Sequence, residues 1–329
     1  MTHSDVGLAR GTPGRSALLF ITDRCPVGCA HCSVDSRADS PTICDWELFG
    51  EILDWFCGEP RLEVVGISGG EPFVERRGLA LASRRLADAG KRQVVYTSGV
   101  WASAAATPRW IAEVLRRCSC VYLSTDAFHA RNVDDDRYVR AAHAIADAGA
   151  RIVVQVVGIE QMVEQARRLL QRAFGERYDD VAELVLTPAL THGRGASVFA
   201  RSAATTPGHA FGPCALASSP VIRYDGLVTG CCNESIVMDH GPARLRRRTG
   251  SGAELAAAVA GLRDDPLLRA IGATGLGALT AHPRFDDLMA ERFTSNCELC
   301  WKMLARSPVT PEPDPLIEAI GGLHRQGAP

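Results

Sequence analysis

The chain has 329 residues, of which 46% are hydrophobic, and this is enough for one large or two medium-sized domains with a sizeable core. Its formal net charge of −2 gives no global field that would attract nucleic acid or an anionic membrane. The polar segment 1–15 lacks the apolar stretch of a secretory signal, and no apolar run approaches the length of a membrane span. We therefore expect a cytoplasmic protein with neither a nucleic-acid nor a membrane partner.

Twelve cysteines are many for an intracellular chain, and their spacing is uneven. Several of them gather in three groups, which are Cys25-x3-Cys29-x2-Cys32, Cys231–Cys232 and Cys297-x2-Cys300. Such clusters favour metal sites in a reducing compartment over a disulfide framework.

Short apolar runs that predict buried strands alternate along the chain with segments of helical periodicity. The strands are expected at Leu18–Thr22, Leu62–Ser68, Gln93–Ser98, Cys120–Thr125, Ile152–Gly158 and Leu184–Thr187. The helices are expected at Trp46–Cys57, Gly78–Ala89, Pro108–Arg117, Asp136–Ala148 and Gln161–Phe174. This rhythm is typical of a parallel sheet, and six βα units predict an α/β fold with a partial (β/α)6 TIM-like barrel.

Composition divides the chain into five parts. We expect a flexible N-terminal arm at 1–16, the barrel at 17–200, a linker at 201–213, a small second domain at 214–306 and a C-terminal tail at 307–329. The linker is rich in Ala, Thr, Gly and Pro.

Two local patterns fall outside the barrel. Val221–Thr229 reads as two short strands around the Asp225–Gly226 turn, which is a strong hairpin signal. The tail begins Pro-rich, and we expect it to be poorly packed, with one short helix at Leu316–Leu323.

Parallel α/β folds place their chemistry at the carboxyl ends of the strands, and the first predicted strand ends at the three-cysteine loop. Thiolates this close in sequence can bind one inorganic centre and leave one of four coordination positions open. From the spacing alone, structural zinc with a distant fourth ligand and three buried thiols are the alternatives.

The cysteine loop, the Gly69–Pro72 motif (Gly-Gly-Glu-Pro) and the six βα units together resemble the radical S-adenosylmethionine (SAM) superfamily over roughly Leu18–Gly195. The resemblance implies that Cys25, Cys29 and Cys32 bind three irons of a [4Fe-4S] cluster whose fourth iron binds SAM. It further implies that an electron from the cluster cleaves SAM and that the resulting 5′-deoxyadenosyl radical abstracts a substrate hydrogen. A flavodoxin- or ferredoxin-type protein would be the electron donor. His31 stands where the family usually has an aromatic residue.

The Gly-Gly-Glu-Pro motif has physical reasons to bind the SAM ammonium group. Gly69 and Gly70 permit a close backbone approach, backbone carbonyls and Glu71 can accept from an ammonium, and Pro72 fixes the turn.

Other polar residues at strand ends are candidates for the rest of SAM. Ser98, Ser124 and Asp126 could bind the ribose hydroxyls, and Arg131 or Arg140 could pair with the methionyl carboxylate. Ordinary caps and turn bonds are the alternative role of such residues.

The second domain resembles the SPASM and twitch extensions of the same superfamily. By that resemblance Cys214, Cys231, Cys297 and Cys300 ligate one auxiliary [4Fe-4S] cluster in a twitch-type domain. Structural zinc on the same thiolates is the alternative, and Cys232 could replace Cys231.

Asp126 and His129 could act as a proton acceptor or contact the substrate, and Cys232 or Cys120 could return a hydrogen atom in an epimerisation. An ordinary hydrogen-bonded pair and inert buried cysteine are the alternatives.

Three functions follow from the resemblance. The first is oxidoreductive modification of a ribosomally made peptide in natural-product biosynthesis, by crosslinking, epimerisation or oxidation. Since only a short arm precedes the first strand, this reading requires a separate leader-peptide-binding protein or a direct grip on the peptide. The second is a radical dehydrogenase or epimerase of a sugar or aminocyclitol, and the third is a non-catalytic iron–sulfur or zinc protein.

Overall fold

The computed structural model describes the chain except for residues 127, 131, 201–203, 310–312 and 327–329, and for 218 and 323–326 it describes the backbone alone. Arg131, one of the expected SAM ligands, and the first residues of the expected linker therefore lie outside the described residues. In the described part of the chain, no helix is long and apolar enough to cross a membrane.

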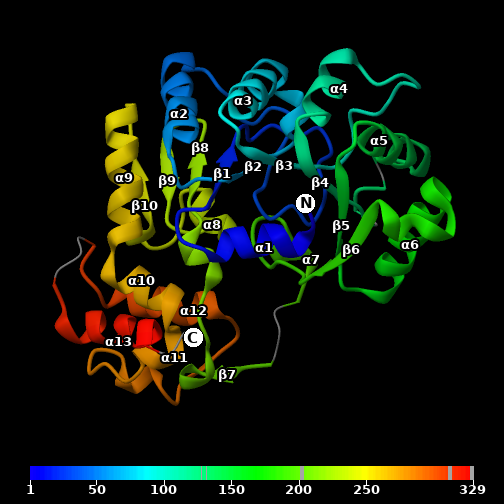
Figure 1. The fold of residues 1–329 in the computed structure, drawn as a ribbon. Coiled ribbons are helices and arrows are strands. Elements are labelled where there is room, and N and C mark those ends of the chain that lie inside the picture. The colour runs from blue at the N-terminus through cyan, green and yellow to red at the C-terminus, as the bar shows by residue number, and fades with distance from the viewer. Residues whose placement is uncertain (127, 131, 201–203, 310–312, 327–329) are drawn as a thin grey trace.

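Six parallel strands form the centre of the molecule and pair in chain order (Figure 1). They are β1 (Ser16–Phe20), β2 (Val64–Ser68), β3 (Arg92–Thr97), β4 (Cys118–Ser124), β5 (Arg151–Val157) and β6 (Ala182–Thr187). Five helices lie outside this sheet, namely α2 (Trp46–Gly58), α3 (Arg76–Asp88), α4 (Arg109–Leu115), α5 (Asp135–Asp147) and α6 (Glu160–Phe174). The expected partial barrel is confirmed.

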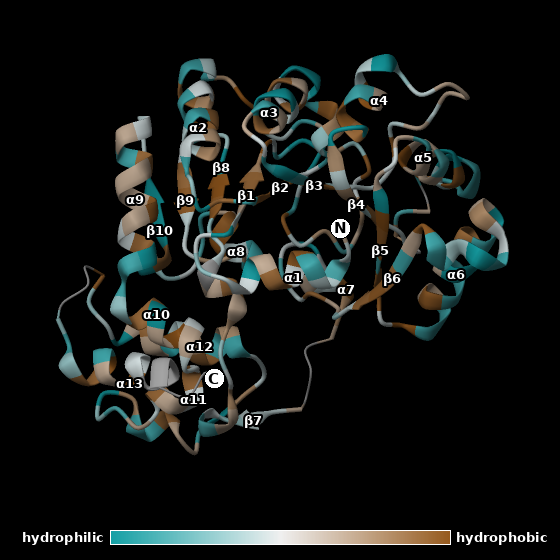
Figure 2. Ribbon diagram, in the orientation of Figure 1, coloured by the Kyte–Doolittle hydropathy of each residue, from teal (hydrophilic) through white to brown (hydrophobic). Residues whose placement is uncertain are grey.

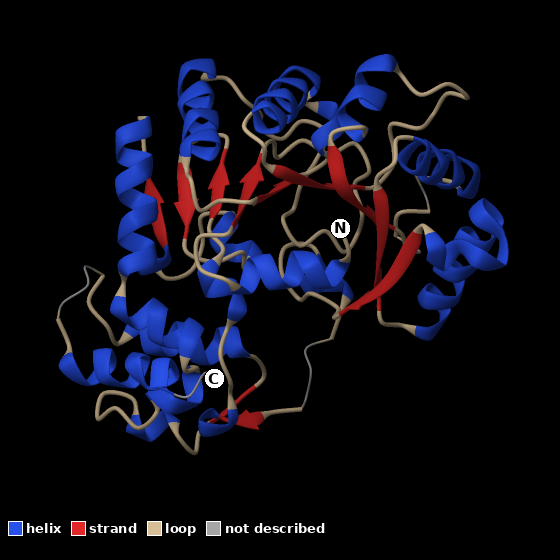
Figure 3. Cartoon of the chain, in the orientation of Figure 1, coloured by secondary structure: helices blue, strands red, loops and turns tan. Residues whose placement is uncertain are grey.

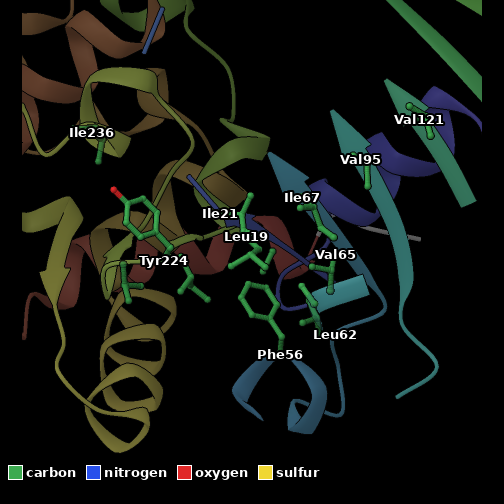
Figure 4. Packing of buried hydrophobic residues seen from close by; sticks show 14 of the residues in the cluster. Leu19, Ile21, Phe56, Leu62, Val65, Ile67, Val95, Val121, Tyr224 and Ile236 are labelled. Atoms are coloured by element: carbon green, nitrogen blue, oxygen red, sulfur yellow. The ribbon is translucent and has the colours of Figure 1, made fainter. Parts of the chain in front are cut away.

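Successive side chains along each strand point to opposite faces of the sheet. Leu19, Val65, Val95 and Val121 point toward the helical layer, where Phe56 of α2 is fully buried against the strands (Figure 4). Val94 and Val153 of the opposite face belong to a second apolar cluster, and Figure 2 shows that β5 is largely hydrophobic.

The N-terminal segment is a packed helix, and the expectation of a flexible arm at 1–16 is wrong there. Helix α1 (His3–Gly11) begins with a capping box between Thr2 and Asp5. Its Val6 and Ala9 are each 3% exposed and pack on the inner face of the sheet. Because α1 is held by these long-range contacts, its short sequence carried too little periodicity to predict it.

The expected hairpin is confirmed, and it extends the barrel sheet. Strand β8 (Val221–Arg223) pairs parallel with β1, β9 (Leu227–Thr229) returns antiparallel, and β10 (Arg246–Arg248) pairs with β9. Gly226 in the turn has φ +81°, and a Cβ there would lie 2.1 Å from the Thr249 carbonyl oxygen. Within the described residues the sheet therefore has nine strands in the order β10-β9-β8-β1-β2-β3-β4-β5-β6.

Most of the remaining elements form a helical unit beside β8–β10 (Figure 3). The remaining helices and strands are α7 (Gly195–Val198), β7 (Thr206–Pro207), α8 (Glu234–Val237), α9 (Gly252–Asp264), α10 (Pro266–Ala273), α11 (Leu276–Leu279), β11 (Arg292–Phe293), α12 (Asn296–Ala305) and α13 (Pro315–Gln326). The expected linker contributes β7, which pairs with β11.

The C-terminal segment is packed, in contrast to the expected poorly packed tail. Ile317 and Ile320 of α13 are 3% and 7% exposed, and the Thr274 hydroxyl donates to the Ile320 carbonyl at 2.8 Å. The helix spans the expected Leu316–Leu323 and is longer than predicted, because α10 supplies an apolar surface that the sequence of the tail does not reveal.

A buried ion pair joins β8 to the root of the cysteine loop. The Arg223 guanidinium donates to both Asp23 carboxylate oxygens, at 2.9 and 2.8 Å, and the Tyr224 hydroxyl donates to Asp23 at 2.8 Å. Asp23 is 5% and Arg223 is 6% exposed. Because Asp23 precedes Cys25 by two residues, this pair fixes the loop to the C-terminal domain.

We predict that Arg223→Met lowers the free energy of unfolding by about 3–5 kcal/mol, because it leaves the Asp23 carboxylate buried without its counterion. Arg248→Met is the matched control, because Arg248 on β10 pairs with Asp239 at an exposed site and its loss should cost about 1 kcal/mol or less. Thermal unfolding of both variants measures the difference, and equal shifts would contradict the structural role of the Asp23–Arg223 pair.

Candidate functional site

The three-cysteine loop has no helix or strand of its own, and the neighbouring β2 loop fixes one side of it. The Gly70 N–H donates to the Thr22 carbonyl at 2.7 Å, and the Glu71 N–H donates to the Arg24 carbonyl at 2.8 Å. A Cβ at Gly69 would lie 2.5 Å from the Thr22 oxygen, and one at Gly70 would lie 2.3 Å from the Arg24 oxygen. Both glycines are therefore required for this close contact between two backbones.

The segment after β6 fixes the other side of the loop. Arg194 donates from Nε to the Cys29 carbonyl at 3.0 Å and from its backbone N–H to the Cys32 carbonyl at 2.9 Å. A Cβ at Gly193 would lie 2.6 Å from the Cys32 oxygen. The Gly-Arg segment thus holds the backbone that carries the second and third cysteines.

A cavity of about 420 Å³ extends from the inner face of the sheet to the carboxyl ends of the strands. Many of the predicted site residues line it, namely Cys25, Cys29, Cys32, Gly69, Gly70, Ser98, Ser124, Asp126, His129 and Cys232. Val157, Tyr96 and Gln155 also line this cavity. Glu71 and Pro72 are buried beside it and are not among the lining residues.

The Glu71 carboxylate is occupied by bonds within the protein. One oxygen accepts from the Thr97 hydroxyl at 2.8 Å, and the other accepts from the Ser98 N–H at 2.9 Å and the Ser98 hydroxyl at 2.6 Å. Although burial raises the pKa of Glu71, these donors favour its ionised form. Glu71 therefore ties the β2 loop to the end of β3.

Polar residues on the strands β4 and β5 and on helix α5 differ in their freedom to bind a ligand. Ser124 and Gln155 lie opposite each other on β4 and β5, and both line the cavity. Arg140, by contrast, donates from Nε to the Ala102 carbonyl at 3.0 Å and is not among the lining residues. The wall near β4 and β5 thus presents polar side chains to the cavity.

Asp126 is the centre of a cluster with two histidines. Its carboxylate oxygens lie 3.1 Å from His31 Nε2 and 2.9 Å from His129 Nδ1, and the Phe128 N–H donates to it at 2.8 Å. Burial opposes ionisation of Asp126, but the bonds from His129 and His31 hold its pKa well below the ordinary value. The centroid of the His31 ring lies 4.6 Å from that of the Phe128 ring.

The structure brings the four C-terminal cysteines to one place. Cys214, Cys231, Cys297 and Cys300 lie close enough for each thiol to interact electrostatically with the other three. Burial is the main reason that the pKa values of Cys231 and Cys300 are raised far above the ordinary value. Cys232 also interacts electrostatically with Cys231 and Cys214, but it differs from the other four in lining the cavity and in accepting from Arg10 Nη2 at 3.1 Å.

Sequence reasoning missed two charged residues of the cavity. Arg10 reaches it from α1, and Glu234 reaches it from the first turn of α8. Arg10 lay in the segment expected to be a flexible arm, so no local signal in the sequence could have identified it. Glu234 lies two residues after Cys232, and this closeness in sequence could have indicated that Glu234 lies near the same site.

Comparison with known proteins gives a consistent picture of the barrel. Residues 19–173 match the family model described as the Radical SAM superfamily. A search of curated protein sequences found no match.

Among solved structures, Streptococcus suis SuiB bound to S-adenosylmethionine aligns with a TM-score of 0.51 and 11% identity, over 78% of this chain and 67% of that chain. SuiB bound to the precursor peptide SuiA gives a TM-score of 0.50 and 12% identity, over 80% and 68% of the two chains. BtrN in complex with AdoMet and 2-DOIA gives 0.45 and 12%, over 84% and 92%. At these identities the likeness to the solved structures concerns the fold, and the match to the Radical SAM family model covers residues 19–173, somewhat less than half of the chain.

Proposed function

We propose that this protein cleaves SAM reductively and abstracts a hydrogen atom from its substrate. The observation that carries the proposal is the fixed position of three cysteines at a cavity lined by Gly69 and Gly70. When bound, a [4Fe-4S] cluster and SAM would supply the 5′-deoxyadenosyl radical that abstracts the hydrogen.

The three loop cysteines fit such a cluster. Burial raises the pKa of Cys25 to about 12, so its thiolate requires a neighbouring cation such as iron. The peptide carbonyls of Cys29 and Cys32 accept from Arg194, which fixes the backbone that carries these two thiols. Three thiolates leave one iron position for SAM.

Within the SAM site we assign separate roles to the predicted residues. Backbone atoms at Gly69 and Gly70, together with the hydroxyl of Ser124, face the cavity and would contact SAM. Pro72 begins the short 3-10 turn after the motif, and Glu71 braces that turn through Ser98. Glu71 thus acts on SAM binding indirectly, by keeping the glycine backbone in place.

Asp126 and His129 are better suited to positioning than to proton transfer. A carboxylate whose pKa is depressed is a weak base, and both oxygens of Asp126 already face donors. His129 in turn interacts with the Cys29 thiol. We propose that Asp126 orients His31 and His129 beside the cysteine loop, as outer groups commonly do at metal centres.

We propose that Cys214, Cys231, Cys297 and Cys300 ligate one auxiliary [4Fe-4S] cluster. Their mutual proximity supports this set, and Cys231 is favoured over Cys232 because Cys232 faces the cavity. Asn233 Nδ2 donates to Cys297 Sγ at 3.4 Å, which is a contact typical of ligand sulfurs. A flavodoxin- or ferredoxin-type donor would supply the electrons.

A ribosomally made peptide is the substrate we propose, modified by crosslinking, epimerisation or oxidation. SuiB, which shares the fold, has been determined with its precursor peptide SuiA, and this analogy is limited to the fold. The cavity of about 420 Å³ must hold SAM and the reacting group, so a single residue of the peptide would enter it. A sugar or aminocyclitol is the second candidate substrate, because a molecule of that size would also enter this cavity. The existence of a separate leader-peptide-binding protein would favour the peptide substrate.

We predict that the anaerobically reconstituted, reduced protein forms 5′-deoxyadenosine from SAM and that Cys25→Ala reduces this to background, because one of three cluster ligands is lost. Cys57→Ala is the matched control, since Cys57 is a half-buried cysteine whose thiol donates to the Arg85 carbonyl far from the loop. Chromatography of the nucleoside measures both. Full activity in Cys25→Ala would refute the proposed cluster site.

We predict that Cys300→Ala loses about four irons per chain and keeps those of the loop cluster. Cys232→Ala is the control and should leave the iron content unchanged, since Cys232 faces the cavity. Iron, sulfide and zinc analysis distinguishes the outcomes. Loss of stoichiometric zinc in place of iron would show a structural zinc site.

We predict that Glu71→Gln destabilises the protein by about 1–3 kcal/mol and weakens SAM binding, because an amide cannot accept from all of the donors at Thr97 and Ser98. Glu113→Gln on the exposed face of α4 is the control. Thermal unfolding and equilibrium dialysis with SAM measure the two effects. Unchanged SAM affinity in Glu71→Gln would contradict the bracing role.

A further inference from the structure

Arg10 and Glu234 place opposite charges in the cavity that the three loop cysteines also line. Arg10 belongs to the last turn of α1 and donates from Nη2 to Cys232 Sγ at 3.1 Å. Glu234 belongs to the first turn of α8, two residues after Cys232. Helices α1 and α8, which are far apart in the sequence, thus place Arg10 and Glu234 near the Cys232 thiol.

Both charges are held by rigid elements. Helix α1 is fixed by its capping box and by the buried Val6 and Ala9. Helix α8 is capped by Asn233, whose side chain accepts from the Ser235 N–H at 3.0 Å, and its Ile236 is fully buried. The positions of the two charged groups are therefore set by packing, as a binding site requires.

Neither charge is neutralised by a strong partner among the described residues. Arg10 donates to a thiol sulfur, which is a weak acceptor. In the same part of the chain, Glu234 makes no ion pair within 4.0 Å, and its carboxylate interacts electrostatically at longer range with His192 and Arg10. Half-buried charges without partners cost free energy, so their retention indicates a polar ligand.

The neighbours of Arg10 favour an anionic ligand group. Tyr96 lines the cavity and interacts electrostatically with Arg10, and burial raises the pKa of Tyr96 to about 12, so its hydroxyl remains a hydrogen-bond donor. A guanidinium fork with a hydroxyl donor beside it matches a carboxylate, which can accept from both.

We propose that Arg10 binds a carboxylate of the substrate and that Glu234 accepts a hydrogen bond from an amine, amide or hydroxyl donor of the same molecule. The inference rests on the proposed function in one respect, since it places the substrate in the cavity beside the loop cysteines. It narrows the substrate to molecules that carry a carboxylate near the reacting carbon. A peptide terminus, an acidic side chain and a small organic acid share this chemistry.

The test uses the charge of an alkylating probe on the anaerobic holoenzyme. The Cys232 thiolate attacks the methylene carbon of iodoacetate or iodoacetamide and displaces iodide in both reactions. The ionised fraction of Cys232 therefore cancels in the ratio of the two rates, and the ratio reports how well the cavity accepts a negatively charged reagent. Exposed Cys44 serves as an internal reference in the same sample. Mass spectrometry of the two cysteine-containing peptides gives both ratios.

We expect the iodoacetate-to-iodoacetamide ratio at Cys232 to exceed that at Cys44 by about fivefold or more, the effect of a nearby cation in a partly buried site. Arg10→Met should remove this preference, Arg10→Lys should retain part of it, and Glu234→Gln should increase it. Equal ratios at the two cysteines, unaffected by Arg10→Met, would overturn the proposal. Thermal unfolding confirms that each variant is folded, and retention of the preference by Arg10→Lys excludes a merely structural effect.

A second arm tests the ligand group. Glycylglycine, which carries a free carboxylate, should slow alkylation of Cys232 by iodoacetamide more than glycylglycinamide does. Equal effects of the two dipeptides, including none from either, would contradict carboxylate recognition. Neither arm uses radical chemistry, so the two failures are distinguishable. Absence of 5′-deoxyadenosine would refute the proposed function, whereas absence of the charge preference at Cys232 would refute carboxylate binding by Arg10.

Discussion

The site depends on one contact between two backbones, in which the Gly70 and Glu71 N–H groups donate to the Thr22 and Arg24 carbonyls. A loop without regular structure must hold three sulfurs toward one point, and it has no hydrogen-bond ladder of its own to do so. Here the neighbouring β2 loop supplies the missing partners, and its glycines let the two chains approach where any side chain would collide. The Glu71 carboxylate accepts hydrogen bonds from Thr97 and Ser98 at the end of β3. The β2 loop, and the cysteine loop that packs on it, are therefore held by the sheet.

The cavity is completed by segments from both ends of the chain. Strand β8 adds to the edge of β1 and brings Cys232 and Glu234 to the barrel, while the Asp23–Arg223 pair joins the same strand to the cysteine loop. Helix α1 covers the inner face of the sheet and contributes Arg10. The cysteine loop follows β1 and Cys231 follows β9, so one end of each proposed site is anchored to the same continuous sheet through β1, β8 and β9.

Helices and strands that show a clear pattern of apolar residues within their own segment could be predicted from the sequence. All six barrel strands and five outer helices lie within two residues of their expected bounds, because continuous apolar runs and helical periodicity report burial directly. Helices α1 and α13 were missed or underestimated because their burial depends on distant surfaces, namely the inner face of the sheet and α10. In the site, cysteine spacing identified the thiols that the structure groups, whereas the roles of Glu71 and Arg194 are set by partners that spacing cannot reveal.

The most direct test of the central claim, that the cysteine loop holds a cluster with one iron open to SAM, is electron paramagnetic resonance of the reduced protein with and without SAM. Cys300→Ala simplifies the spectrum by removing the proposed auxiliary cluster. The account predicts a [4Fe-4S] signal in this variant whose g-values change when SAM is added, and no such signal once Cys25→Ala is also introduced. A signal that SAM leaves unchanged would contradict it, because the cluster would then have no open position.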